Sequence, residues 1–559
     1  MTRAMGRMVV QTRFVIAVVV LLAGAFSASE EGAAGRAAAQ SSCFVALGHG
    51  DVQGSNLGAS CAFLAIPYAE SPAGNNRWKQ PQPADPWAPS LLMATAPPPP
   101  CPAVAVFGPP SISGIEDCLK LNVWAPNPLP SERAPVIVWL HTGAFIGASA
   151  NFPGTNGGRL AHETGVIVVA PNYRLGPLGF LAHTALSAED PLGSSGNYGL
   201  LDQRAALRWV QDNIAQFGGD PDNVTIAGTS AGGQSVGLHL VSPGSAGLFH
   251  RAVIQSAYPT SRWTSDAEAK AQGDAFAAAL GCTDPSQLLA CMRLAPANAV
   301  LTALVQATQQ VREPAGRTFW EPSVDGIVIP DQPRHLFESG AFHRVPTIVG
   351  FTRDEGWGNF ITRSFPSGVN TGQYEAWVTS EFGPYASNVL DLYPASSAAP
   401  IETMARLVGD VQFVCEARRV ARAIERTGTP TFLYAYEYEI DDLSLDHVIH
   451  GVESNILFGN HYVPPVFLNH PLDAADFDLH DKMAGYWARF AATGNPNRGD
   501  SAFSWPPFTR PEGLGRGTDK HIILDSVIGE GVRLRERQCD FFEAFFFRSV
   551  LGSLPASAQ

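Results

Sequence analysis

Between residues 120 and 260, short apolar runs alternate with helical segments. The runs lie at 121–124, 135–140, 165–170, 223–227 and 252–255. They are apolar throughout rather than at every second residue, so we expect strands that are buried on both faces of a sheet. A helical pattern fills 201–217, and Gly218 to Pro221 ends it. Strand, helix and strand in this order predict an α/β fold with a doubly wound, mostly parallel sheet.

Two later runs, at 345–351 and 431–436, are expected to add strands to the same sheet. The patterns in 261–340 and 360–425 predict helices and loops. We interpret them as large helical insertions that build a lid and a pocket wall, with a separate helical domain as the alternative. The chain has 559 residues, of which 45% are hydrophobic and 16% charged, which suits one large α/β domain over 40–559.

The net charge of the chain is −14. A charge of this sign repels phosphate backbones and anionic membrane surfaces, so we expect no nucleic-acid partner. The sequence carries no signal for the oligomeric state.

The first 39 residues have the pattern of a signal peptide. Arg3, Arg7 and Arg13 precede an apolar run at 14–26, and small residues suited to cleavage end at Ser27 and at Ala39. An uncleaved membrane anchor is the alternative, although the run is short for a span and no later segment offers about 18 uninterrupted apolar residues. We therefore expect a secreted or periplasmic protein without a stable membrane anchor.

Eight cysteines follow this segment, an even number that fits an oxidising compartment. Their spacing favours local bridges within 43–61, 101–118 and 282–291, and leaves Cys415 and Cys539 as a distant pair. Eight cysteines allow 105 pairings, so the residues alone leave the connectivity open, and buried free thiols are the alternative. No Cys-x-x-Cys pair indicates a metal site.

The segment Gly228-Thr-Ser230-Ala-Gly232 follows one expected strand directly and precedes a helical stretch at 233–240. This context is typical of a nucleophile elbow, in which flanking glycines permit a sharp turn that lifts the serine hydroxyl clear of the sheet. A second match to the Gly-x-Ser-x-Gly pattern, Gly233-Gln-Ser235-Val-Gly237, places Ser235 inside the helix. The geometry of an elbow therefore favours Ser230 as the nucleophile.

A serine nucleophile needs a histidine to accept its proton and a carboxylate to orient that histidine. In α/β-hydrolases these groups follow in the order serine, acid, histidine. Glu355 lies just beyond the expected strand at 345–351, with Asp354 as its neighbouring rival. His450 lies in a loop after the strand at 431–436, with His447 as the nearest competitor.

Acyl transfer also needs N–H donors for the oxyanion. The amide of Ala231, the residue after the nucleophile, lies at a helix N-terminus that favours negative charge. The turn after the strand at 135–140, His141-Thr-Gly-Ala, offers the amides of Gly143 and Ala144. An ordinary turn at the end of a strand is the alternative.

Together these residues resemble the type B carboxylesterase family, the α/β-hydrolases that include cholinesterases and many microbial esterases and lipases. The resemblance covers nearly all of the chain after residue 40. The matching segments are Phe63-Leu-Ala-Ile-Pro-Tyr-Ala-Glu70, Glu116-Asp-Cys-Leu-Lys-Leu-Asn-Val123, Asn172-Tyr-Arg174, Asn197-Tyr-Gly-Leu-Leu-Asp-Gln203, Phe217-Gly-Gly-Asp-Pro221, the elbow, Asp354-Glu-Gly356, His450-Gly451 and Cys539.

This resemblance implies a triad of Ser230, Glu355 and His450. It also implies the disulfides 101–118, 282–291 and 415–539, which leaves Cys43 and Cys61 as the fourth pair. No metal or organic cofactor is implied.

Three departures from the family pattern bear on the oxyanion hole and on the substrate. Thr142 stands where the family usually has glycine, and Thr229 stands where it usually has a glutamate beside the nucleophile. The loop between Cys101 and Cys118 contains no tryptophan for a cation–π contact with a choline group. The sequence therefore disfavours a cholinesterase and predicts a serine carboxylesterase that cleaves small uncharged esters through an acyl-enzyme.

Two other functions remain as alternatives. One is an interfacially activated lipase, whose lid the insertions would supply. The other is a non-catalytic binding protein on the same fold, which the presence of all three triad positions disfavours. The acyl and alcohol preferences have no signal in the sequence.

Overall fold

The computed structural model describes residues 43–105, 111–310, 320–357, 361, 365, 367–395, 399–440, 446–460, 462–463, 468–469, 471–497, 503–509 and 518–544. Residues 41–559 form one compact unit. The predicted signal peptide, 1–39, lies outside the described residues. None of the helices in the described ranges combines the length and the apolar character that a membrane span requires.

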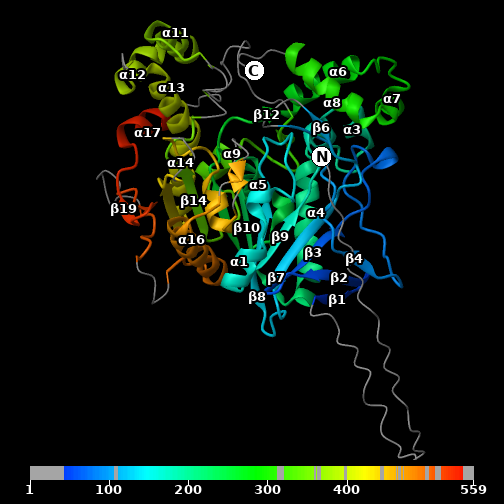
Figure 1. Ribbon diagram of the computed structural model, residues 1–559. Helices are drawn as coiled ribbons and strands as arrows, with labels where there is room; N and C mark the ends of the chain where they lie inside the picture. Colours follow the sequence, from blue (N-terminus) through cyan, green and yellow to red (C-terminus); the bar gives the residue numbers. More distant parts are fainter. Residues whose placement is uncertain are drawn as a thin grey trace, which may run out of the picture. The chain divides into compact units, whose positions relative to one another are not determined.

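A 13-stranded sheet forms the centre of the unit 41–559 (Figure 1). Every neighbouring pair from β9 to β18 is parallel, whereas the pairs at both margins are antiparallel, apart from β4, which pairs in parallel with β2. The expected mostly parallel α/β sheet is thereby confirmed. In spatial order the strands are β1 (Phe44–Leu47), β2 (Gly50–Asn56), β3 (Ser60–Pro67), β7 (Lys120–Pro126), β9 (Ile167–Pro171), β8 (Ala134–Leu140), β10 (Gly219–Thr229), β11 (Arg251–Gln255), β14 (Thr347–Thr352), β15 (Thr431–Tyr436), β18 (His521–Leu524) and β19 (Gly529–Gly531), with β4 (Leu92–Ala94) beside β2.

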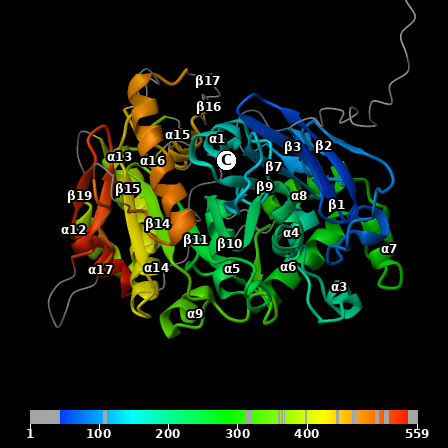
Figure 2. The same cartoon turned by 90° about the horizontal axis from the view of Figure 1, so that it is seen from below.

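Helices cover both faces of this sheet (Figure 2). One face packs against α4 (Tyr198–Asn213), α5 (Ala231–Val241) and α14 (Cys415–Glu425), and the other packs against α1 (Gly158–Thr164), α15 (Glu453–Phe458) and α16 (Ala474–Thr493). Strand β8 shows the consequence: Val136 and Val138 enter the core on the α4 and α5 side, whereas Ile137 and Trp139 enter the core on the opposite side. Strands apolar at every position therefore fill two cores at once.

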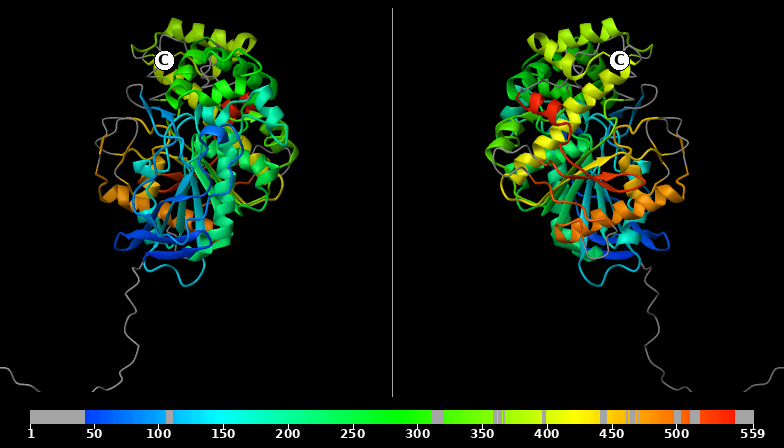
Figure 3. Two further views of the ribbon diagram at one scale, coloured as in Figure 1. Left: turned by 90° about the vertical axis from the view of Figure 1, so that its right-hand side faces the viewer. Right: turned by 90° about the vertical axis from the view of Figure 1, so that its left-hand side faces the viewer.

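Most helices of the two insertions gather over one end of the sheet (Figures 1 and 3), whereas α9 (Pro333–Ser339) packs against α5 and α14. The first contains α6 (Asp266–Ala279), α7 (Leu288–Leu294), α8 (Ala297–Gln310) and α9 (Pro333–Ser339), and the second contains α11 (Thr371–Phe382), α12 (Ala386–Leu392), α13 (Pro400–Gly409) and the π-helix η6 (Asp410–Val414). The π-helix runs directly into α14 and contacts β14, so the second insertion reaches the sheet beside the end of a central strand.

Short elements complete the described part of the chain. They are α2 (Gly176–Phe180), α3 (Thr184–Glu189), α17 (Glu536–Glu543), the 3-10 helices η1 (Gly74–Asn76), η2 (Pro153–Thr155), η3 (Ile214–Phe217), η4 (Pro243–Ser245) and η5 (Gly383–Tyr385), and the two-stranded sheets β5 (Ala103–Val104) with β6 (Ile112–Ser113), β12 (Thr264–Ser265) with β13 (Ser323–Val324), and β16 (Tyr462–Val463) with β17 (Leu468–Asn469). The helix expected over 201–217 is thus α4 followed by η3, and Gly218 ends it in a left-handed conformation with a φ of 85°.

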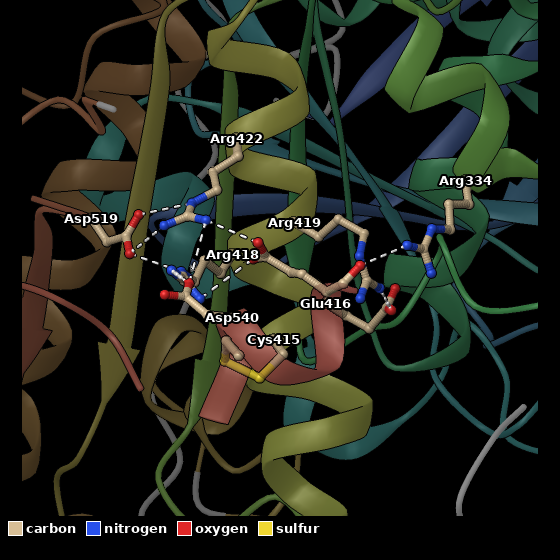
Figure 4. A network of polar contacts seen from close by, with 10 residues as sticks. Arg334, Cys415, Glu416, Arg418, Arg419, Arg422, Asp519 and Asp540 are labelled. Atoms are coloured by element: carbon tan, nitrogen blue, oxygen red, sulfur yellow. Dashed lines mark hydrogen bonds and ion pairs between the residues drawn. A yellow bond between two sulfur atoms is a disulfide. The ribbon is translucent and has the colours of Figure 1, made fainter. Parts of the chain in front are cut away.

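Four disulfides join the eight cysteines in the pairs expected from the sequence: Cys43–Cys61, Cys101–Cys118, Cys282–Cys291 and Cys415–Cys539. The last of these joins α14 to α17. Around it, Arg418 of α14 donates to Asp519 at 2.8 Å and to Asp540 of α17 at 2.5 Å (Figure 4). Because α14 continues from η6, this bridge and these ion pairs hold the end of the second insertion against the sheet.

Candidate active site

Ser230 occupies the turn between β10 and α5, with a φ of 57° and a ψ of −124°. Such a conformation is strained for a residue with a Cβ and is typical of functional sites. Its flanking glycines allow the turn to pack closely, since a Cβ on Gly232 would lie 2.0 Å from the carbonyl oxygen of Leu140, at the end of β8. The turn therefore sits against the end of the neighbouring strand.

Ser235, the other serine in a Gly-x-Ser-x-Gly match, lies inside α5 and is completely buried. Its hydroxyl donates to the carbonyl of Ala231 at 2.9 Å and accepts from Gln203 at 3.1 Å. A serine that is held in this way supports helix packing rather than attack on a substrate.

Glu355 follows β14 and pairs with His450. One carboxylate oxygen accepts the N–H of Thr352 at 2.8 Å, and the other lies 2.5 Å from Nδ1 of His450. Since a carboxylate accepts, the Nδ1 nitrogen carries the proton in this pair. Glu355 is 1% exposed, so the charge-assisted hydrogen bond is shielded from water and fixes the orientation of the ring.

The rival residues of the loops have other partners. Asp354 accepts the N–H of Val448 at 2.8 Å and pairs with Arg353 at 2.9 Å, while its backbone forms a bridge to Ile449. His447 packs on the ring of Trp357, with the centroids 3.9 Å apart. Asp354 thus ties the 446–450 loop to the end of β14, and this tie brings His450 to Glu355.

The turn after β8 presents backbone amides beside the elbow. Gly143 has a φ of 116°, and a Cβ there would lie 2.1 Å from the carbonyl oxygen of Gly147. Ala144 also has a positive φ, of 52°. Within the residues that the structure describes, no protein acceptor binds the N–H of Gly143, Ala144 or Ala231. These three amides are thus available to a ligand oxygen.

Thr142 does not disturb this turn. Its φ is not among the positive ones, so the left-handed backbone that disfavours β-branched residues begins only at Gly143. Burial lowers the pKa of His141 to about 4, and the neutral ring donates from Nδ1 to the carbonyl of Thr142 at 2.8 Å. Because carbonyl and N–H point in opposite directions across a trans peptide, this contact turns the N–H of Gly143 away from His141.

A second buried glutamate, Glu453, lies near the pair of Glu355 and His450. Its carboxyl is fully buried and accepts from Ser256 at 2.9 Å. Burial, and then the charge of Glu355, raises the pKa of Glu453 to about 7. Sequence reasoning missed this residue, and its spacing of three positions after His450 is the only signal that could have drawn attention to it.

Two further contacts shape the surroundings of His450. The hydroxyl of Thr229 lies 2.7 Å from that of Ser454 on α15, so the residue before Ser230 touches the helix that follows His450. From the second insertion, the ring of Phe413 in η6 packs 4.9 Å from the ring of His450. The π-helix is a form that often occurs at functional sites, but nothing in the sequence distinguishes Phe413 from other apolar residues of the insertion.

Comparisons with known proteins agree with this arrangement. The chain is 36% identical to a fumonisin B1 esterase from Sphingopyxis macrogoltabida, over 80% of this chain and 81% of that protein. It is 33% identical to a para-nitrobenzyl esterase from Bacillus subtilis strain 168, over 86% of this chain and 94% of that protein. The model of the carboxylesterase family matches residues 41–520. The chain therefore belongs to the carboxylesterase family and is a carboxylic-ester hydrolase.

Proposed function

We propose that Ser230, Glu355 and His450 form the catalytic triad and that the amides of Gly143, Ala144 and Ala231 form the oxyanion hole. The observation that carries this proposal is the 2.5 Å contact between Glu355 and His450, at the same end of the sheet as the strained turn of Ser230. The acid and the base follow parallel strands β14 and β15, and only β11 separates β14 from the strand that precedes Ser230.

In this mechanism the hydroxyl of Ser230 attacks the ester carbonyl while Nε2 of His450 takes its proton. Glu355 holds the proton on Nδ1 and stabilises the imidazolium that forms. The three amides donate to the oxygen that becomes negative in the tetrahedral intermediate. His450 then returns the proton to the leaving alcohol, and water releases the acid from the acyl-enzyme by the same steps.

The substrates that we propose are small uncharged esters, of the kind that the name of the para-nitrobenzyl esterase describes. Thr229 replaces the acidic residue that would attract a cation beside Ser230, and its hydroxyl is engaged by Ser454. Glu453, the other nearby acid, has a pKa of about 7 and therefore offers only partial charge to a cationic group at neutral pH.

The test is hydrolysis of p-nitrophenyl esters with acyl chains of two to twelve carbons. Ser230→Ala should abolish turnover and leave the thermal melt nearly unchanged, whereas the matched variant Ser235→Ala should keep most of the activity. Retained hydrolysis in Ser230→Ala would contradict the proposal. A rate that rises sharply once long-chain esters exceed their solubility would indicate the lipase alternative.

We also propose that the chain is exported to the periplasm or the medium and loses its first residues there. Four disulfides support an oxidising compartment. Sequencing of the mature N-terminus should find a start at residue 28 or 40. An intact N-terminus on a protein that stays in the cytoplasm would refute this assignment.

A further inference from the structure

A cluster of metal-ligating side chains lies where α1, α15 and α16 meet, on the face of the sheet opposite α4 and α5. At its centre His480 of α16 is completely buried. Its Nδ1 lies 2.7 Å from the carbonyl oxygen of Ile456 in α15, and its Nε2 lies 2.6 Å from a carboxylate oxygen of Glu163 in α1. Both ring nitrogens therefore face an oxygen that accepts.

The carbonyl of Ile456 can only accept, so Nδ1 of His480 donates to it and Nε2 points toward the carboxylate of Glu163. A histidine whose other ring nitrogen donates to a backbone carbonyl has the usual orientation of a metal ligand.

Asp481 completes a set of three ligands. The nearest ligand atoms of Glu163, His480 and Asp481 all lie within 4.8 Å of one another, and the two carboxylates are exposed. A metal can thus enter from solvent while the imidazole stays in the core. Glu163 is also held on its far side, where Arg159 donates to its other oxygen at 3.0 Å.

Gly459, which ends α15 with a φ of 60°, leaves the space that this cluster needs. A Cβ at this position would lie 3.0 Å from Nε2 of His480 and 2.3 Å from the side chain of Arg159. A side chain at 459 would therefore crowd Nε2 of His480.

We propose that Glu163, His480 and Asp481 bind a divalent transition metal, for which zinc is the probe. One imidazole and two carboxylates form a donor set that zinc accepts, with water in the remaining position. The metal would replace the direct contact between His480 and Glu163 and join α1 to α16, while His480 stays hydrogen-bonded to Ile456 of α15. Since α15 begins three residues after His450, such a site would steady the segment that carries the catalytic histidine without touching the substrate.

The experiment measures zinc binding by the tag-free mature protein after treatment with EDTA and desalting. Isothermal titration and metal analysis should find one zinc per chain, and zinc should raise the melting temperature. Asp481→Asn and Glu163→Gln should weaken binding by at least tenfold. Asp478→Asn, which removes an exposed carboxylate from the same helix, and His447→Gln, which removes a histidine that lies near Glu402, should leave binding unchanged.

His480→Gln should abolish zinc binding, but it alters the core. The two exposed carboxylate variants therefore decide the matter if this variant fails to fold. No stoichiometric zinc uptake by the unsubstituted chain, or equal affinity in Asp481→Asn and Asp478→Asn, would overturn the proposal and leave the cluster as a direct pairing of His480 with Glu163. None of these outcomes depends on the assignment of Ser230.

Discussion

Replacing Glu355 by glutamine should remove most of the catalytic power and little of the fold. Glu355 uses both of its oxygens as acceptors, one for the N–H of Thr352 and one for the Nδ1–H of His450. Glutamine keeps the size of the side chain but offers one oxygen and one NH2 group. In either orientation of the amide, the NH2 group faces one of the two donors, the N–H of Thr352 or the Nδ1–H of His450.

The glutamine oxygen should face Thr352, because a backbone N–H can only donate, whereas Nδ1 of His450 can accept once its proton moves to Nε2. The NH2 group then donates to Nδ1 of His450, and the ring proton moves to Nε2, where it blocks proton transfer from Ser230. A wrong tautomer of this kind costs about 10⁴-fold in kcat in a serine triad. At about 1.4 kcal/mol for each factor of ten, the activation barrier rises by about 5–6 kcal/mol.

The assay compares kcat for p-nitrophenyl butyrate in Glu355→Gln and in Asp354→Asn. Asp354 holds the loop through Val448 and Arg353, so its variant should lose far less activity. A Glu355→Gln enzyme that keeps more than a tenth of kcat, or a larger loss in Asp354→Asn, would refute the reasoning.

Other substitutions test the surroundings of the site. Glu453, with its pKa raised from 4.5 to about 7, keeps a proton in the folded state that the unfolded chain releases, so the free energy of unfolding falls as pH rises from 4.5 to 7. Glu453→Gln should remove about 2.5 kcal/mol of the fall between pH 5 and pH 7.5, as measured by urea titrations at these two pH values. Gly143→Ala, whose Cβ would meet a carbonyl oxygen at 2.1 Å, should lower kcat by about 10²–10³-fold, and an unchanged kcat would exclude this turn from the oxyanion hole. Replacing Cys415–Cys539, which spans 124 residues, by serines should cost about 5 kcal/mol in denaturant unfolding, against about 3 kcal/mol for Cys282–Cys291, which spans 9; equal costs would contradict the loop-entropy argument.

The central strands were predictable because burial on both faces leaves an uninterrupted apolar run. The expected strand at 431–436 coincides with β15, and the one at 135–140 differs from β8 by a single residue. The marginal strands β1 to β4, β18 and β19 were not predicted. Apart from β3, which has eight residues and is mostly buried, they are short or partly exposed, and their pairing depends on distant neighbours that a local pattern does not contain.

The site residues divide in the same way, into those that local sequence determines and those that depend on contacts distant in the chain. Strand and helix on either side distinguish Ser230 from Ser235, because an elbow is a local structure. Glu355 and Asp354 are adjacent residues of one loop, and only the pairing of Asp354 with Ile449 and Val448 determines which carboxylate meets His450. Glu453 escaped prediction because its environment is set by tertiary packing around α15.

The most direct test of the triad is covalent labelling with a p-nitrophenyl phosphonate, followed by digestion and mass mapping. We predict one equivalent of label on Ser230, loss of esterase activity in proportion to labelling, and no label in Ser230→Ala. Label on another serine together with loss of activity, or full hydrolysis by an enzyme whose Ser230 is completely labelled, would contradict this prediction.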